Sequence, residues 1–269
     1  SSVIAGSASR EVANQLQSSG AVYDRLWDQR AHELQSAAQL LARDFGFREA
    51  VASGDAATMR SALGNSAARL KVRSAFTTSA DGNVTSTDRT FALSEAGPLW
   101  DALDAGRMSG VSVLGGKPRQ LVAAPIMAPN LVGWVIFSSD LDRREMRGLE
   151  QLSAIPLHAA VLTHGHGRWY EAAGSMGGIG GPSAALALRH VGSAASFEMN
   201  VGERPSITLA KPLPTLVEGE RAILLLAYPK SEALADARKL QLALAAMTLL
   251  GLVLVAFATW KAASRITKP

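Results

Sequence analysis

The chain has 269 residues, 48% of them hydrophobic and 19% charged, which is the composition of a folded protein with room for two ordinary domains. It contains no cysteine, which excludes disulfides, thiolate chemistry and cysteine-ligated zinc. Three of the 27 basic residues and none of the 23 acidic residues lie beyond Lys239, so the net charge of +4 falls to +1 for residues 1–239, too little for a nucleic-acid-binding surface.

Residues 9–45 predict one long amphipathic helix. Apolar or small side chains recur at steps of three and four, among them Val12, Leu16, Tyr23 and Leu34, and no proline interrupts the pattern. The loose heptad suits packing on the domains that follow, and it equally suits pairing with a second copy in a dimer.

After the helix the hydrophobic pattern changes to period two. Residues 70–79 predict a strand, followed by a tight turn on Asp81-Gly82 and a second strand. A helix is expected over residues 92–106. Three further strands are expected in quick succession, over residues 108–114, 120–126 and 131–138. Two strands, a helix and three strands indicate an antiparallel sheet with helical cover, an α+β arrangement.

A charged helix over residues 140–154 leads to a second, shorter cycle of the same kind. Two strands are expected over residues 157–163 and 168–171, and a helix over residues 183–190. The cycle closes with three more strands, over residues 196–201, 206–212 and 221–228. The same order of elements occurs twice without obvious sequence identity, which predicts two similar modules.

Residues 240–260 form an uncharged apolar run that would span about 30 Å as a helix, enough to cross a membrane. A buried helix of a globular domain is the alternative. An aromatic residue and a basic tail follow the run: Trp260, Lys261, Arg265 and Lys268. By the positive-inside rule this end is cytoplasmic, so residues 1–239 are expected in the periplasm, with an export signal upstream of residue 1.

No motif in the chain indicates catalysis. His164 and His166 supply at most two metal ligands, fewer than a zinc site needs. The glycine-rich run at residues 174–182 lacks the GK[ST] of a P-loop, and no G-x-S-x-G elbow is present. Asp140 and Asp142 are interpreted as acids at the start of a helix. We therefore expect neither enzyme activity nor a metal or cofactor.

Four internal runs and the C-terminal tail carry a family resemblance. The runs are QLLARDFGFREAVASGDAATMRSALGN, PLWDALDAG, LVAAPIMAP and GWVIFSSDL, and the tail is RITKP. The runs resemble the double Cache sensor domains of bacterial transmembrane receptors, and RITKP resembles the first residues of a HAMP linker. The resemblance covers essentially the whole chain. The amino-acid-binding signature of some double Cache receptors, built on Tyr, Arg, Trp and Asp at fixed spacings, is not evident here.

The resemblance implies an α+β fold in which a long N-terminal helix carries two stacked PAS-like (Cache) antiparallel-sheet modules, followed by a C-terminal transmembrane helix. The expected segments are a helix at 1–45, a membrane-distal module at 46–150, a membrane-proximal module at 151–230, a helix with the transmembrane segment at 231–262, and the start of a HAMP linker at 263–269. It further implies a homodimer and a small-molecule pocket, most often in the distal module.

Candidate ligand residues are polar or aromatic side chains of the first module: Arg73, Thr77, Trp100, Ser112, Arg119 and Gln120. Arg73 and Thr77 share one face of the first strand, because alternate residues of a strand point the same way. An arginine such as Arg73 or Arg119 binds a carboxylate through two hydrogen bonds. The alternative is that the arginines face solvent and Trp100 belongs to the core. The second module has a weaker cluster, Arg168, Trp169 and Tyr170.

The sequence thus predicts the periplasmic sensory region of a receptor of the bacterial inner membrane, with a small-molecule ligand, the lipid bilayer and a second copy as partners. The output domain, a diguanylate cyclase or phosphodiesterase of c-di-GMP signalling or a histidine kinase, would lie outside this chain. The alternative from another class is a membrane-anchored periplasmic solute-binding or scaffold protein without signalling output. An enzyme with an active site in residues 45–230 is a third possibility.

Overall fold

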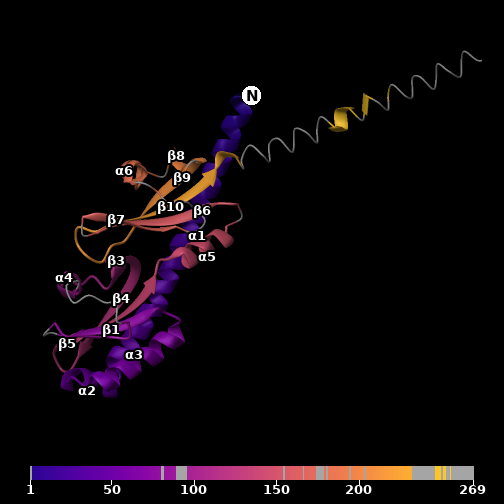
Figure 1. Ribbon diagram of the computed structural model, residues 1–269. Helices are drawn as coiled ribbons and strands as arrows, with labels where there is room; N and C mark the ends of the chain where they lie inside the picture. Colours follow the sequence, from indigo (N-terminus) through magenta and orange to yellow (C-terminus); the bar gives the residue numbers. More distant parts are fainter. Residues whose placement is uncertain are drawn as a thin grey trace, which may run out of the picture.

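Two antiparallel sheets are stacked along one long helix in the computed structural model (Figure 1). The structure describes residues 2–79, 82–88, 96–153, 155–165, 167–173, 179, 181–193, 195–202, 204–231, 246–249, 251–252 and 255. The predicted α+β fold, with a long N-terminal helix and two similar modules, is confirmed.

The long helix α1 covers Ser2–Arg43 and ends two residues before the predicted boundary. Asp44 has extended backbone, with φ −62° and ψ 129°, and its carboxylate accepts a hydrogen bond from the Phe47 amide at 2.8 Å. A side chain that satisfies a free amide in this way begins a new helix. The single helix predicted for residues 9–45 is therefore divided at Asp44.

Two short helices, which the periodicity did not predict, follow α1. They are α2 (Phe45–Ser53) and α3 (Ala56–Leu70), separated by Gly54 in the left-handed conformation. Asp55 caps α3, and hydrogen bonds from the Thr58 hydroxyl and then from nearby backbone amides hold the pKa of Asp55 below its ordinary value. Both caps are local, so the chain reverses without a long loop.

The first of the two modules, called the distal module below, is a five-stranded sheet with helices on both faces. Its strands are β1 (Ser74–Ser79), β2 (Val84–Ser86), β3 (Ser109–Leu114), β4 (Lys117–Met127) and β5 (Leu131–Asp140), in the order β2-β1-β5-β4-β3. One face packs on α1, α2 and α3, and the other packs on α4 (Ala96–Asp104). Each face has its own core because alternate side chains point to opposite sides.

The proximal module repeats this topology. Helix α5 (Arg143–Gln151) leads to strands β6 (His158–Gly165), β7 (Arg168–Ala173), β8 (Phe197–Val201), β9 (Arg204–Leu213) and β10 (Arg221–Pro229), in the order β7-β6-β10-β9-β8. Helix α6 (Gly181–His190) covers the face that α4 covers in the distal module. In each sheet the last strand lies at the centre, between the first and the fourth.

Helix α1 contributes to the cores of both modules. Val12, Leu16 and Trp27 pack with the proximal sheet, whereas Leu34 and Ala38 pack with the distal sheet. Each half of α1 therefore buries its apolar stripe against a different module. The loose heptad thus serves to pack α1 on the domains that follow it.

The loop between β9 and β10, residues 214–220, clamps the proximal module onto the distal sheet. We call it the strap. The Val111 amide donates to the Pro214 carbonyl at 2.7 Å, and the Leu216 amide donates to the Val111 carbonyl at 2.9 Å. Thr215 thereby pairs with Val111 in parallel, next to the edge strand β3. A sheet edge that would otherwise present unpaired amides is covered by the other module.

Leu216 of the strap is fully buried in the distal core, in the same cluster as Leu99 and Leu103 of α4. The close approach requires a glycine on β3, because a Cβ on Gly110 would lie 2.6 Å from the Leu216 nitrogen. A side chain encoded in the second module thus completes the core of the first.

The C-terminal part of the fold prediction concerns residues 240–260, most of which lie outside the described residues. Within the described part, no helix combines the length and the apolar character needed to cross a membrane.

Replacing Leu216 by alanine is expected to lower the free energy of unfolding by about 2 to 5 kcal/mol, because it opens a cavity in the distal core. Leu40→Ala is the control: Leu40 is 67% exposed on α1, and its truncation is expected to change stability by less than about 0.5 kcal/mol. Urea unfolding followed by circular dichroism measures both. Equal losses in the two variants would contradict the role given to Leu216.

Candidate ligand site in the distal module

A buried arginine lies at one end of the sheet face that packs on α4. On β4, Arg119 alternates with Leu121 and Ala123, which belong to the α4-side core, so its side chain is on that face. Only 5% of Arg119 is exposed. A buried guanidinium requires partners that offset the loss of its hydration.

Two carboxylates and a hydroxyl surround Arg119. Its Nε lies 3.2 Å from Oδ1 of Asp140, and its Nη2 lies 3.3 Å from Oδ2 of Asp88. Its Nη1 donates a hydrogen bond to Oγ of Ser74 at 3.2 Å. Arg73 approaches the same Asp140 from the surface, at 3.8 Å and with 65% of its side chain exposed. Two positive and two negative charges thus balance each other.

The hydrogen bonding of this face is incomplete. Among the described residues, Thr78 Oγ1, Ser138 Oγ and Trp134 Nε1 are buried and have no hydrogen-bond partner. Nε of Arg119 and Oδ1 of Asp140 are close but also lack hydrogen-bond geometry. Buried polar atoms are nearly always paired in folded proteins, so a group of unpaired ones indicates a place for an additional partner.

Two tryptophans lie at the other end of the same face. Trp134 on β5 and Trp100 on α4 meet edge to face, with ring centroids 6.4 Å apart. Thr78 is the residue opposite Trp134 in the pairing of β1 with β5. The face therefore combines an ionic cluster at one end with aromatic rings and a hydroxyl at the other.

The structure brings together four of the six residues predicted from the sequence. Ser112 lies opposite Arg119 in the pairing of β3 with β4, and both are buried. Arg73 joins this group through Asp140, and Trp100 joins the face through Trp134.

Thr77 and Gln120 lie on the opposite face of the sheet. The Thr77 hydroxyl contacts the sulfur of Met59 on α3 at 3.8 Å. Gln120 alternates with Arg119 along β4 and lines a cavity beside α1. Neither side chain lies on the face of the ionic cluster, although Gln120 is next to Arg119 in the chain.

Sequence reasoning did not assign either carboxylate of the cluster to the site: Asp88 was not singled out, and Asp140 was placed at the start of a helix. Asp142 is the N-cap of α5, accepting hydrogen bonds from the amides of Arg144 and Glu145, as an acid at a helix start does. Asp140 is instead the last residue of β5 and pairs with Arg119. The interpretation of Asp140 as a helix-start acid is therefore wrong. Extending the period-two pattern of β5 by two residues would have put Asp140 on the face of Trp134.

The weaker cluster of the second module is built differently. The rings of Trp169 and His164 lie 5.0 Å apart across the pairing of β6 with β7. On the α6 side of this sheet, Thr208 Oγ1 is buried and has no hydrogen-bond partner within the residues that the structure describes. In the part of the chain that the structure describes, no three histidine, cysteine or acidic side chains gather as a metal site would require.

Two stacked modules with a repeated 2-1-5-4-3 strand order on one long helix define a class, the double Cache sensor domains. The chain belongs to the family described as the double sensory domain of two-component sensor kinases, whose model matches residues 9–234. None of the curated protein sequences matches the chain.

Solved structures with the same fold include sensor domains of two kinds of receptor. The extracellular domain of vpHK1S-Z8, named as a histidine kinase, is 13% identical with a TM-score of 0.56, over 88% of this chain and 96% of that one. The sensor domain of the Vibrio cholerae histidine kinase DctB is 13% identical with a TM-score of 0.53, over 82% and 96%. The ligand-binding domain of the Pseudomonas fluorescens chemoreceptor CtaA, in complex with L-isoleucine, is 14% identical with a TM-score of 0.51, over 87% and 98%.

Arg119→Met is expected to lower the free energy of unfolding by about 3 kcal/mol, because it leaves the carboxylates of Asp88 and Asp140 without their buried partner. Arg73→Met removes a more distant and mostly exposed charge from the same Asp140, so a loss below about 1 kcal/mol is expected. Urea unfolding at neutral pH measures both. A loss that is as large for Arg73→Met as for Arg119→Met would contradict the central place of Arg119.

Proposed function

We propose that this chain is the ligand-sensing region of a bacterial transmembrane receptor and that its ligand binds in the distal module. The ligand would lie on the α4 face of the sheet, between the ionic cluster of Arg119 and the pair of tryptophans. In this proposal the distal module spans residues 46–150 and the proximal module spans residues 151–230.

The observation that carries the proposal is a group of buried polar atoms on one sheet face that have no hydrogen-bond partner among the described residues: Thr78 Oγ1, Ser138 Oγ and Trp134 Nε1. A bound molecule could satisfy them, which would repay the cost of leaving them unpaired. The corresponding α6 face of the proximal module offers a single such atom, Thr208 Oγ1, among the described residues. This difference favours the distal module as the principal site.

The ligand class follows from the charges. Arg119 and Arg73 are already balanced by Asp88 and Asp140, so a dianion would be poorly matched. A small zwitterion fits better, because its carboxylate and ammonium groups would each meet an opposite charge. CtaA and the Campylobacter jejuni chemoreceptor Tlp3 are solved with L-isoleucine or L-valine. This chain lacks the amino-acid signature described above, so amino acids are the first compounds to test rather than an assigned ligand.

Ligand binding would be transmitted along the elements that join the modules. Leu216 of the strap contacts the α4-side core, and the strap leads directly into β10. A ligand that prefers one arrangement of α4 would shift the population of strap positions and thus of β10. From β10 the change would pass into residues 231–260, which we propose to include the second transmembrane helix.

The remaining parts of the proposal concern the receptor as a whole. They are a location in the bacterial inner membrane with residues 1–239 in the periplasm, a homodimer through α1 and the transmembrane helices, a HAMP linker beginning near residue 263, and a cytoplasmic output. The output would be a histidine kinase or a module that makes or degrades c-di-GMP. The second candidate, a membrane-anchored solute-binding or scaffold protein, is distinguished by what is encoded after Pro269. A HAMP linker and an output domain support the receptor, and their absence supports the anchor.

Thr78→Val tests the site without disturbing the fold. The Thr78 hydroxyl is buried and has no hydrogen-bond partner in the described part of the chain. The variant is therefore expected to be as stable as the wild type or more stable, yet to bind the ligand more weakly, by about fivefold or more. The measurement is a thermal-shift screen with the twenty amino acids and other small metabolites, followed by titration of each hit.

Thr77→Val is the matched control, since Thr77 neighbours Thr78 but points to α3. Its effect on ligand affinity should be negligible. If Thr77→Val weakens binding while Thr78→Val does not, the ligand lies on the other face of the sheet.

A further inference from the structure

The cavity that Gln120 lines lies on the side of the distal sheet that faces away from the site described above. It has a volume of about 280 Å³, is partly open to solvent and is lined by residues of α1, β4 and α5 at the junction of the two modules. Tyr23 and Trp27 of α1, Gln120 of β4 and Leu149 of α5 contribute to its wall. Its size is close to the lower end of the range for small-molecule sites.

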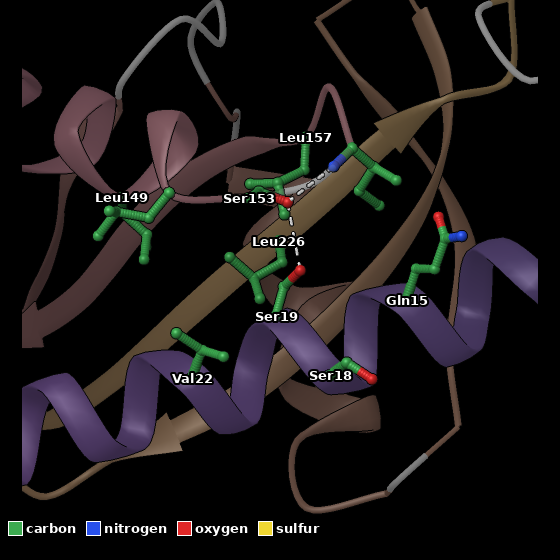
Figure 2. Close-up of a pocket in the computed structure, with 10 residues that line it drawn as sticks. Gln15, Ser18, Ser19, Val22, Leu149, Ser153, Leu157 and Leu226 are labelled. Atoms are coloured by element: carbon green, nitrogen blue, oxygen red, sulfur yellow. Dashed lines mark hydrogen bonds between the residues drawn. The ribbon is translucent and has the colours of Figure 1, made fainter.

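A smaller cavity of about 210 Å³ adjoins it and shares Leu149 and Leu152 with it. Figure 2 shows this smaller cavity between α1 and α5, with Val22 and Ser19 on the helix and Leu226 of β10 behind them. The hollow between α1 and α5 is therefore mostly apolar and extends from β4 of the distal sheet to β10 of the proximal sheet.

Gln120 is the unusual member of the larger cavity. Only 3% of it is exposed, and its Nε2 has no hydrogen-bond partner among the described residues. The side-chain amide of a buried glutamine needs a partner, and the rest of this wall is largely apolar. A hydrogen-bond acceptor inside the cavity would therefore satisfy the Gln120 amide.

The charges around the cavity indicate that the acceptor is uncharged. Arg30 is already engaged, donating to Glu33 and to the Leu70 carbonyl, both at 2.8 Å. Glu145 lies at the cavity and forms no ion pair within the described ranges. Its negative charge disfavours a carboxylate ligand.

The Tyr23 hydroxyl adds a neutral donor to this wall. Burial, with a further contribution from the negative charges of Glu145 and Asp24, raises the pKa of Tyr23 above its ordinary value. The ring of Tyr23 lies 5.9 Å from that of Trp27, so the two form an aromatic side of the cavity. Aromatic and leucine side chains on the other walls favour an apolar ligand body.

We propose that this cavity binds a small, uncharged, mostly apolar molecule that presents a carbonyl oxygen to the Gln120 amide. This site is separate from the proposed ligand site of the distal module, although adjacent residues of β4, Arg119 and Gln120, belong to the two sites. A molecule held here would contact α1 and α5 at once and would resist any sliding of one helix against the other.

Three fluorinated probes of the same shape test the proposal by fluorine NMR titration of the full chain. They are para-fluoroacetophenone, which has a neutral carbonyl, para-ethylfluorobenzene, which has no acceptor, and para-fluorobenzoate, which is charged. The ketone is expected to bind roughly tenfold more tightly than the hydrocarbon, because it satisfies Gln120, and also more tightly than the benzoate. A ketone that does not bind, or binds no better than the hydrocarbon, overturns the proposal.

Two variants locate the binding. Gln120→Leu is expected to abolish the preference for the ketone over the hydrocarbon, whereas the same substitution at the exposed Gln39 should preserve it. Gly148→Leu fills the cavity from α5, because a Cβ at this position meets nothing within 4 Å. This variant should abolish binding of the ketone and of the hydrocarbon without loss of thermal stability. A ketone preference that survives Gln120→Leu, or binding that survives Gly148→Leu, refutes the site. Thr78→Val should not affect these probes, so the outcome is independent of the distal ligand site.

Discussion

One helix covers a face of each sheet, and the rest of the architecture depends on this shared cover. A five-stranded sheet with an apolar face is unstable in water until that face is buried. Here α1 buries Val12, Leu16 and Trp27 against the proximal sheet and Leu34 and Ala38 against the distal sheet. Arg30, where the apolar stripe is imperfect, lies between the two contact regions and binds the Leu70 carbonyl. The irregularity in the sequence thus marks the junction of the modules.

Because α1 is continuous, the modules can move relative to each other only by sliding or tilting on it, and the strap restricts this further. The strap is hydrogen-bonded to β3 and places Leu216 in the distal core. Packed interfaces of this kind switch between discrete arrangements rather than deforming gradually. A change in the packing of α4 therefore alters the contacts of Leu216, which is only five positions from the start of β10. This is a short physical route from one module to the other.

The sequence was sufficient for the repeated α+β organisation, because period-two alternation and turn residues identify strands in both modules. It did not identify α2 and α3, whose small and mixed side chains give little periodicity. The candidate site could be predicted only in part. Alternation shows which residues of one strand share a face. The pairing register decides against which helices that face packs and which residues of the adjacent strands lie beside it. Thr77 was therefore grouped with Arg119, although it points the other way. Gln120 was also grouped with Arg119, although consecutive residues of a strand point to opposite faces. Asp140 was assigned to the start of the next helix because it follows the apolar part of β5.

The strap also determines what can be exchanged between related proteins. A recombination event at the boundary between the modules would supply a new proximal module with its own β9–β10 loop, and that loop would have to complete a foreign distal core beside Gly110. A smaller side chain in place of Leu216 would leave a void, and any side chain in place of Gly110 would prevent the strap from docking. The two modules repeat one topology, yet a proximal module can be replaced only by one whose strap fits the distal core.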